Sequence, residues 1–222
     1  MEKIIYHGSE KIIKTPQYGI GNRRNDYGRG FYCTEDIELA KEWACGNSNN
    51  GYANIYKINL NKLQILNLNS EKYGILHWLA ILADNRTYWK KSSIAEENKK
   101  YLKDNFLIDI SQYDVIIGYR ADNSYFSYAN NFVNNIISLN QLDKAMRLGN
   151  LGEQFVLKSK KAFEQITFVD FEEASADIYY NKKIAREREA RENYKVLKSE
   201  KITSEDLLMI DIVRRRLDCT SV

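Results

Sequence analysis

The chain of 222 residues has few of the residues that build disulfide frameworks and metal centres. Its three cysteines, Cys33, Cys45 and Cys219, are widely spaced and form no Cys-x-x-Cys motif. Neither a disulfide framework nor a zinc site is therefore indicated, and reduced thiols are expected. The two histidines, His7 and His77, are too few for a histidine-rich metal centre. We expect no metal.

Long apolar runs are also missing. No stretch of about 18 apolar residues occurs, and the first residues lack the apolar core of a secretory signal. We therefore expect a cytoplasmic protein with no membrane partner. The net charge of +3 is too small to indicate nucleic-acid binding by itself, although local clusters of charge can still provide it.

The beginning of the chain predicts a strand and a long loop. Residues 2–6 are largely apolar and partly β-branched, which is typical of a buried strand with His7 at its end. Residues 17–30 hold four glycines among polar residues and predict a long ordered loop. A loop of this length inside a compact domain is usually functional.

The middle of the chain alternates between strand and helix patterns. Thr34 is expected to cap a helix that carries Trp43 on its apolar stripe. Residues 52–60 alternate in polarity and, with residues 64–68, predict an antiparallel pair. Helical spacing over about 70–110 indicates an all-helical insertion.

The last part of the chain returns to strands and then becomes strongly charged. Residues 114–118 predict a buried strand, and residues 152–159 and 166–171 predict two more. Residues 172–222 predict a charged helical extension, whose run at 182–192 is most simply a solvated helix face. Strands that bracket helices predict an α+β fold over residues 1–171.

Four blocks of sequence give a more specific resemblance. The blocks are Tyr6-His7-Gly8-Ser9, Asp26-Tyr27-Gly28-Arg29-Gly30-Phe31-Tyr32-Cys33-Thr34, Ile116-Ile117-Gly118-Tyr119-Arg120-Ala121-Asp122-Asn123-Ser124 and Glu153-Gln154-Phe155-Val156-Leu157-Lys158-Ser159. In this order, they resemble a bacterial family of domains of unknown function that is itself similar to ADP-ribosyltransferases of the diphtheria-toxin and poly(ADP-ribose) polymerase type.

The resemblance implies a split pair of mainly antiparallel sheets around an NAD cleft. It implies that His7 bonds the nicotinamide-side ribose, that the Gly8 backbone holds the carboxamide and that Ser9 bonds the ribose as well. Tyr32 would stack on the nicotinamide ring, with a second aromatic residue that the sequence does not identify. The loop residues that complete this NAD-binding set are Gly28, Arg29, Gly30 and Phe31.

The reaction itself requires groups that stabilise an oxocarbenium-like centre. Glu153 or Gln154 would do this, and only one of them can face the cleft because neighbours on a strand point to opposite faces. Asp122 would activate the acceptor, and Arg120 would contact the pyrophosphate. Asn123 stands where the resemblance leads us to expect a second acid.

Each assignment has a structural alternative. His7 at a strand end can simply satisfy a backbone group, Gly28 and Gly30 can serve a turn, and Arg120 with Asp122 can form an internal salt bridge.

The leading hypothesis is an NAD-dependent ADP-ribosyltransferase that releases nicotinamide and modifies a macromolecule, protein or nucleic acid. Such an enzyme would act as a bacterial toxin, in a toxin–antitoxin pair or in phage defence, with a possible cognate antitoxin. The alternatives are a non-catalytic module that binds NAD, ADP-ribose or a nucleic-acid end, and an interaction protein that works through its C-terminal helices.

Overall fold

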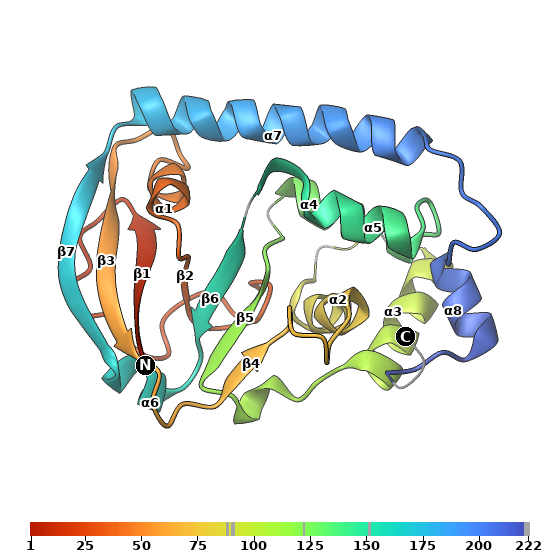
Figure 1. The fold of residues 1–222 in the computed structure, drawn as a ribbon, viewed down its shortest axis with the longest axis horizontal. Helices are drawn as coiled ribbons and strands as arrows, with labels where there is room; N and C mark the ends of the chain where they lie inside the picture. The colour runs from red at the N-terminus through yellow and green to blue at the C-terminus, as the bar shows by residue number, and fades with distance from the viewer. Residues whose placement is uncertain (88, 90–91, 122, 151, 220–222) are drawn as a thin grey trace.

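Two β-sheets meet edge to edge in a computed structural model of the protein, which describes residues 1–87, 89, 92–121, 123–150 and 152–219 (Figure 1). The first sheet is antiparallel and has the strand order β1-β3-β7. The second has the order β2-β6-β5-β4, and only its β4–β5 pair is parallel. The strands are β1 (Glu2–Ser9), β2 (Phe31–Cys33), β3 (Gly51–Asn59), β4 (Ile65–Asn67), β5 (Val115–Tyr119), β6 (Glu153–Leu157) and β7 (Ile166–Ala174).

Within the described part of the chain, one β-bridge joins the two sheets. The Tyr6 N–H donates to the Thr34 carbonyl at 2.8 Å, and the Thr34 N–H donates to the Tyr6 carbonyl at 2.9 Å. Tyr6 lies in the middle of β1 and Thr34 directly follows β2. The sheets are therefore continuous at this level of the strands and separate elsewhere.

Helices cover the second sheet and one end of the first. In Figure 1, α7 crosses the top of the view, from α1 at one end to α4 and α5 at the other, and contacts to α1 and α5 agree with this. The helices are α1 (Ile37–Ala44), α2 (Ile75–Asn85), α3 (Ser93–Phe106), α4 (Asn123–Val133), α5 (Leu139–Met146), α6 (Lys160–Glu164), α7 (Ala176–Ser199) and α8 (Met209–Arg215). Two 3₁₀ turns complete the set, η1 (Ile110–Gln112) and η2 (Leu148–Asn150).

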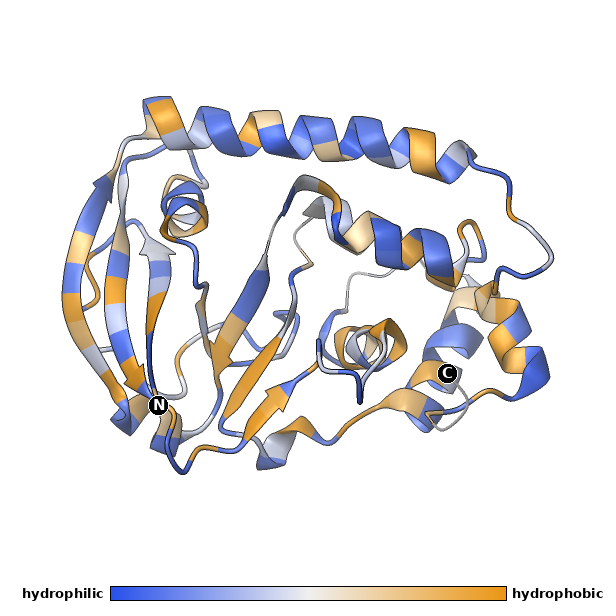
Figure 2. Cartoon of the chain, viewed as in Figure 1, coloured by the Kyte–Doolittle hydropathy of each residue, from blue (hydrophilic) through white to orange (hydrophobic). Residues whose placement is uncertain are grey.

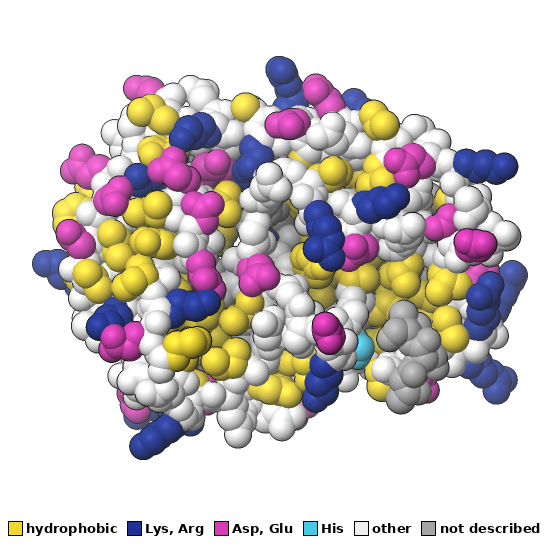
Figure 3. All heavy atoms as spheres, viewed as in Figure 1, with side chains coloured by type: hydrophobic (Ala, Val, Ile, Leu, Met, Phe, Trp, Pro, Cys, Tyr) yellow, Lys and Arg dark blue, Asp and Glu magenta, His cyan; other side chains and the backbone are white. Residues whose placement is uncertain are grey.

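The apolar core has two main parts. The larger lies between the second sheet and the helices and includes Trp78, Tyr128 and Phe132. The smaller lies where the sheets face each other and includes Ile5 and Phe155. Figure 2 shows that α7 is hydrophilic along most of its length, with isolated apolar residues. Figure 3 shows apolar side chains gathered over the three-stranded sheet at the left of the view.

The α+β class predicted from the sequence agrees with this arrangement, while two local predictions were wrong. β4 does not pair with β3: it runs parallel to β5 in the other sheet, because the chain turns away after β3. The cap of α1 is Asp36, whose carboxylate accepts from the N–H groups of Glu38 and Leu39. Thr34 lies two residues before this cap, and its hydroxyl accepts from the Asp36 N–H at 3.2 Å.

The C-terminal segment is built onto the strands rather than attached beyond them. β7 continues to Ala174, past the expected end of the last strand at residue 171, and α7 follows directly. Arg186 and Glu42 pair across α7 and α1 at 2.7 Å, with side chains 13% and 9% exposed. In the part of the chain that the structure describes, no helix combines the length and apolarity needed to cross a membrane.

Candidate functional site

His7 lies on β1 with its ring held in one orientation. Its Nδ1 is 2.7 Å from the Tyr32 carbonyl oxygen, and its ring lies 4.3 Å from that of Phe31. A carbonyl only accepts, so Nδ1 carries the proton and Nε2 is the acceptor. Burial lowers the pKa of His7, which keeps the imidazole neutral at pH 7. His7 therefore offers a fixed hydrogen-bond acceptor.

Tyr32 is fixed by the loop that precedes it. Its hydroxyl donates to the Gly28 carbonyl at 2.5 Å and accepts from the Tyr27 N–H at 3.1 Å. Gly28 has a φ of +70°, which only glycine adopts without strain at a turn. Burial raises the pKa of the Tyr32 hydroxyl, so that it remains a neutral donor. The glycine loop thus sets the orientation of the aromatic ring.

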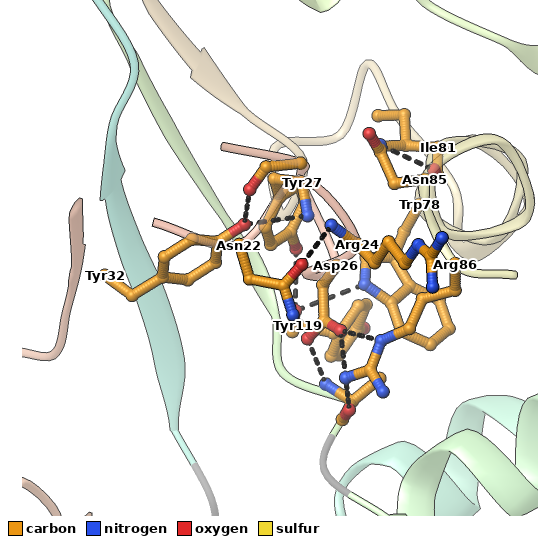
Figure 4. A network of polar contacts seen from close by, with 12 residues as sticks. Asn22, Arg24, Asp26, Tyr27, Tyr32, Trp78, Ile81, Asn85, Arg86 and Tyr119 are labelled. Carbon is orange, nitrogen blue, oxygen red and sulfur yellow. Dashed lines mark hydrogen bonds and ion pairs between the residues drawn. The ribbon is translucent and has the colours of Figure 1, made fainter. Parts of the chain in front are cut away.

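A buried ion pair anchors the same loop (Figure 4). The Asp26 carboxylate, 3% exposed, accepts from Arg86 Nε at 2.8 Å and Nη2 at 2.5 Å, and from the Ala121 N–H at 2.8 Å. Arg86 also donates to the Ala121 carbonyl at 2.6 Å. Burial raises the pKa of the Asp26 carboxyl, and Arg86 opposes this rise. The pair ties the loop, the end of α2 and the segment after β5 together.

Lys158 holds the loop from another side. It directly follows β6, and its Nζ donates to the carbonyls of Tyr27 and of Arg29, the latter at 2.7 Å. Burial lowers the pKa of Lys158 to about 8.

Sequence analysis did not identify Asp26 and Arg86 as a pair, because the two residues are far apart in the chain and no local pattern links them.

The residues His7, Tyr32 and Gln154 lie on three laterally adjacent strands. β1 meets the end of β2 at the bridge between Tyr6, which precedes His7, and Thr34. β2 in turn pairs with β6, which begins with Glu153 and Gln154. Residues distant in sequence are therefore brought to one level of the joined sheets.

Gln154 is the buried member of the Glu153 and Gln154 pair. It is 7% exposed, and its Oε1 has no hydrogen-bond partner among the described residues. Glu153 is exposed. It lines a pocket with Tyr119 and Arg147, and Gln154 is not part of that lining. A buried acceptor without a donor is costly to leave unsatisfied, so Gln154 is the residue suited to a ligand hydroxyl.

Trp43 closes the site from α1. A Cβ added to Gly8 would lie 2.0 Å from the Ala40 carbonyl oxygen and 2.8 Å from Trp43 Cβ, so glycine is required for this close approach. The Arg120 guanidinium stacks on the Trp43 ring, 3.9 Å from its centroid. The Trp43 Nε1 is buried and has no acceptor among the described residues. The apolar stripe predicted Trp43 as a helix residue and gave no signal for this role.

Together these contacts form a closed series, which we call the contact ring. It runs along β1 from Gly8 and His7 to Tyr6, crosses the bridge to Thr34 and the β2–β6 ladder to Gln154, and continues through Gly118, the partner of Gln154 on β5, to Arg120. Arg120 stacks on Trp43, which in turn lies against Gly8. The contacts that form it are the bridge, the β2–β6 and β5–β6 ladders, the stacking of Arg120 and the close approach of Gly8 to α1.

The other predicted site residues lie around this ring or apart from it. Ser9 lines a polar pocket of about 490 Å³ beside Trp43, and its hydroxyl accepts from the Lys11 N–H at 3.2 Å. Phe31 packs in the smaller core against Tyr56, with ring centroids 5.5 Å apart.

Two further predictions concern groups outside the ring. Arg29 and Gly30 line a second pocket together with Lys158. Asp122 lies outside the described residues. Among the residues that are described, no group of three or more His, Cys, Asp or Glu side chains is arranged to hold a metal ion.

Comparison with known proteins gives a family without a function. The chain belongs to the family described as protein of unknown function (DUF3990), whose model matches residues 3–168. No curated protein and no solved structure matches the chain.

Proposed function

We propose that the protein is an NAD-dependent ADP-ribosyltransferase that transfers ADP-ribose to a macromolecule with release of nicotinamide. The single observation that supports this most is the contact ring, in which the predicted His7 and Gln154 lie on β1 and β6, the two strands on either side of β2. Two mainly antiparallel sheets that meet beside the ring favour an ADP-ribosyltransferase-like arrangement around an NAD site.

The polar atoms of the ring fit the groups that NAD carries. Gln154 Oε1 is a buried acceptor and Trp43 Nε1 a buried donor, and neither has a protein partner among the described residues. His7 Nε2 supplies a second acceptor of fixed orientation. A ligand with sugar hydroxyls and a carboxamide would satisfy acceptors and donor together, which an apolar ligand would not.

The chemistry follows from what NAD supplies when bound, a glycosidic bond whose cleavage leaves positive charge on the ribose. Gln154 Oε1 would accept a hydrogen bond from the ribose 2′-hydroxyl. This bond would raise the electron density on the 2′-oxygen as the positive charge develops on the ribose. Tyr32 and Trp43 would hold the flat nicotinamide ring. Arg120, stacked on Trp43, would bind the anionic part of the molecule. Asp122 keeps its proposed role toward the acceptor.

The test is nicotinamide release from NAD together with labelling of a cell extract by labelled NAD. We expect the purified protein to do both, and Gln154→Ala and His7→Ala each to lower the rate by roughly 100-fold, the effect of removing one preorganised polar group. Glu153→Gln is the matched control, since that side chain is exposed. A protein that neither releases nicotinamide nor labels any target, beside an active reference transferase, overturns the proposal.

A second candidate function is a binding module for NAD, ADP-ribose or a nucleic-acid end. The neutral amide at Gln154 favours it, because a carboxylate would stabilise positive charge more strongly. Calorimetry that detects NAD binding without any turnover would support this alternative.

The cellular role follows from the enzymatic proposal. A cytoplasmic toxin that modifies a macromolecule would arrest growth when it is expressed, and a cognate antitoxin would restore growth. Arrest by the wild-type protein, and none by Gln154→Ala expressed at the same level, is the expected result.

A further inference from the structure

The segment that joins β1 to β2, residues 10–30, carries an excess of positive charge on its surface. Its five cations are exposed, whereas Asp26 is 3% exposed and paired with Arg86. The other carboxylate of the segment, Glu10, is exposed and accepts from Asn47 at 3.0 Å, so five exposed cations accompany one exposed carboxylate on this surface. The five cations are Lys11, Lys14, Arg23, Arg24 and Arg29.

An aromatic pocket lies beside these cations. Tyr18 is 56% exposed, and its ring meets that of Phe163 edge to face at 5.7 Å. The pocket has a volume of about 360 Å³, enough for one flat heterocycle, and its wall includes Tyr113, Arg29 and the half-buried Lys158. Basic groups next to exposed rings are the combination that binds single-stranded nucleic acid, in which bases stack and phosphates pair with cations.

A continuous series of rings connects this pocket with the contact ring. His7 contacts Phe31 at 4.3 Å, Phe31 contacts Phe163 at 6.1 Å, and Phe163 contacts Tyr18. Arg29 also lies close to Tyr32 in the chain. A nucleic-acid strand held in the pocket would thus lie beside the rings that lead to His7, where the proposed transfer of ADP-ribose would take place.

We propose that residues 11–30 and this pocket bind single-stranded nucleic acid, with one base stacked on the exposed ring of Tyr18. The acceptor of the transferase is then a nucleic acid, an assignment that rests on the proposed function, whereas strand binding does not. An acidic protein would use the cations and leave the aromatic pocket empty, and a duplex hides its base faces. The observations therefore favour a single strand.

The experiment is fluorescence anisotropy with labelled single-stranded DNA and RNA of about 12 nucleotides, without NAD, over a series of salt concentrations. We expect log Kd to rise linearly with log salt concentration. Tyr18→Ala and the double variant Arg23→Glu/Arg29→Glu should each weaken binding about tenfold or more. Lys195→Glu is the control, an exposed cation on α7. Thermal midpoints of all variants show whether each is folded.

Several outcomes would overturn the inference. These are equal binding by the charge-reversed variant, equal competition by duplex DNA or polyglutamate, and displacement by adenosine monophosphate or NAD at matched concentrations. His7→Ala should bind the strand as the wild type does. Strand binding without nicotinamide release would refute only the proposed function, and nicotinamide release without strand binding would refute only this inference.

Discussion

Gly8→Ala tests the close approach of β1 and α1 on which the contact ring depends. The added methyl would lie 2.0 Å from the Ala40 carbonyl oxygen and 2.7 Å from the Ala44 backbone nitrogen. Both are backbone atoms, so a rotamer change cannot relieve the clash, and α1 must move outward by about 1 Å. On its other side, α1 is held by α7 through the pair of Glu42 and Arg186.

Overpacking of this kind costs about 1–3 kcal/mol, and a clash with two backbone atoms of α1 places the effect toward the upper end. For a chain of this length, each kcal/mol lowers the thermal midpoint by about 2–4 °C. We therefore expect Gly8→Ala to lower the midpoint by roughly 4–12 °C. Because Trp43 moves with α1, nicotinamide release should fall as well.

The assay is thermal unfolding followed by circular dichroism, with Gly74→Ala as the control. A Cβ at Gly74 meets nothing within 4 Å, and as the cap of α2 the substitution costs at most about 1 kcal/mol. If Gly8→Ala unfolds at or above the midpoint of Gly74→Ala, the close approach of α1 to β1 is not a constraint and the reasoning is refuted.

Three further predictions concern buried polar groups. Asp26→Asn and Arg86→Met should each lower the free energy of unfolding in urea by about 3–5 kcal/mol, and the double variant by less than the sum of the two. Additive losses would contradict a direct interaction between the two side chains. Because burial lowers the pKa of His7 below 6.5, the unfolded state binds more protons just below that pH. Stability should therefore rise with pH up to about 6.5, and a His7→Gln variant with the same pH profile would contradict this. Glu42→Gln should weaken the contact with Arg186 and speed tryptic cleavage of α7, while an unchanged cleavage rate would speak against α7 being held there.

Local patterns in the sequence were sufficient for most strands and for the α+β class. The apolar run at 114–118 predicted a buried strand, and β5 spans Val115–Tyr119. The pairing of strands was not predictable in the same way. Which strands pair in a sheet depends on how distant parts of the chain pack together. The sequence of residues 52–68 therefore contains no signal that β4 pairs with β5.

The candidate site shows the same division. Alternation along a strand established that Glu153 and Gln154 face opposite ways, but which of them is buried depends on the helices and strands packed on each face of β6. Asp26 is an ordinary acid in a glycine-rich loop until Arg86 on α2 is brought beside it. Trp43 belongs to an apolar stripe that would suit any packed helix.

The sequence by itself therefore determined the elements and the residue types, because periodicity and turn chemistry act over a few positions. Only the tertiary structure decided which side chains meet. The contact ring draws on residues from 8 to 154. Their association is set by packing and by pairing between distant strands, which are properties of the whole chain and have no local signal.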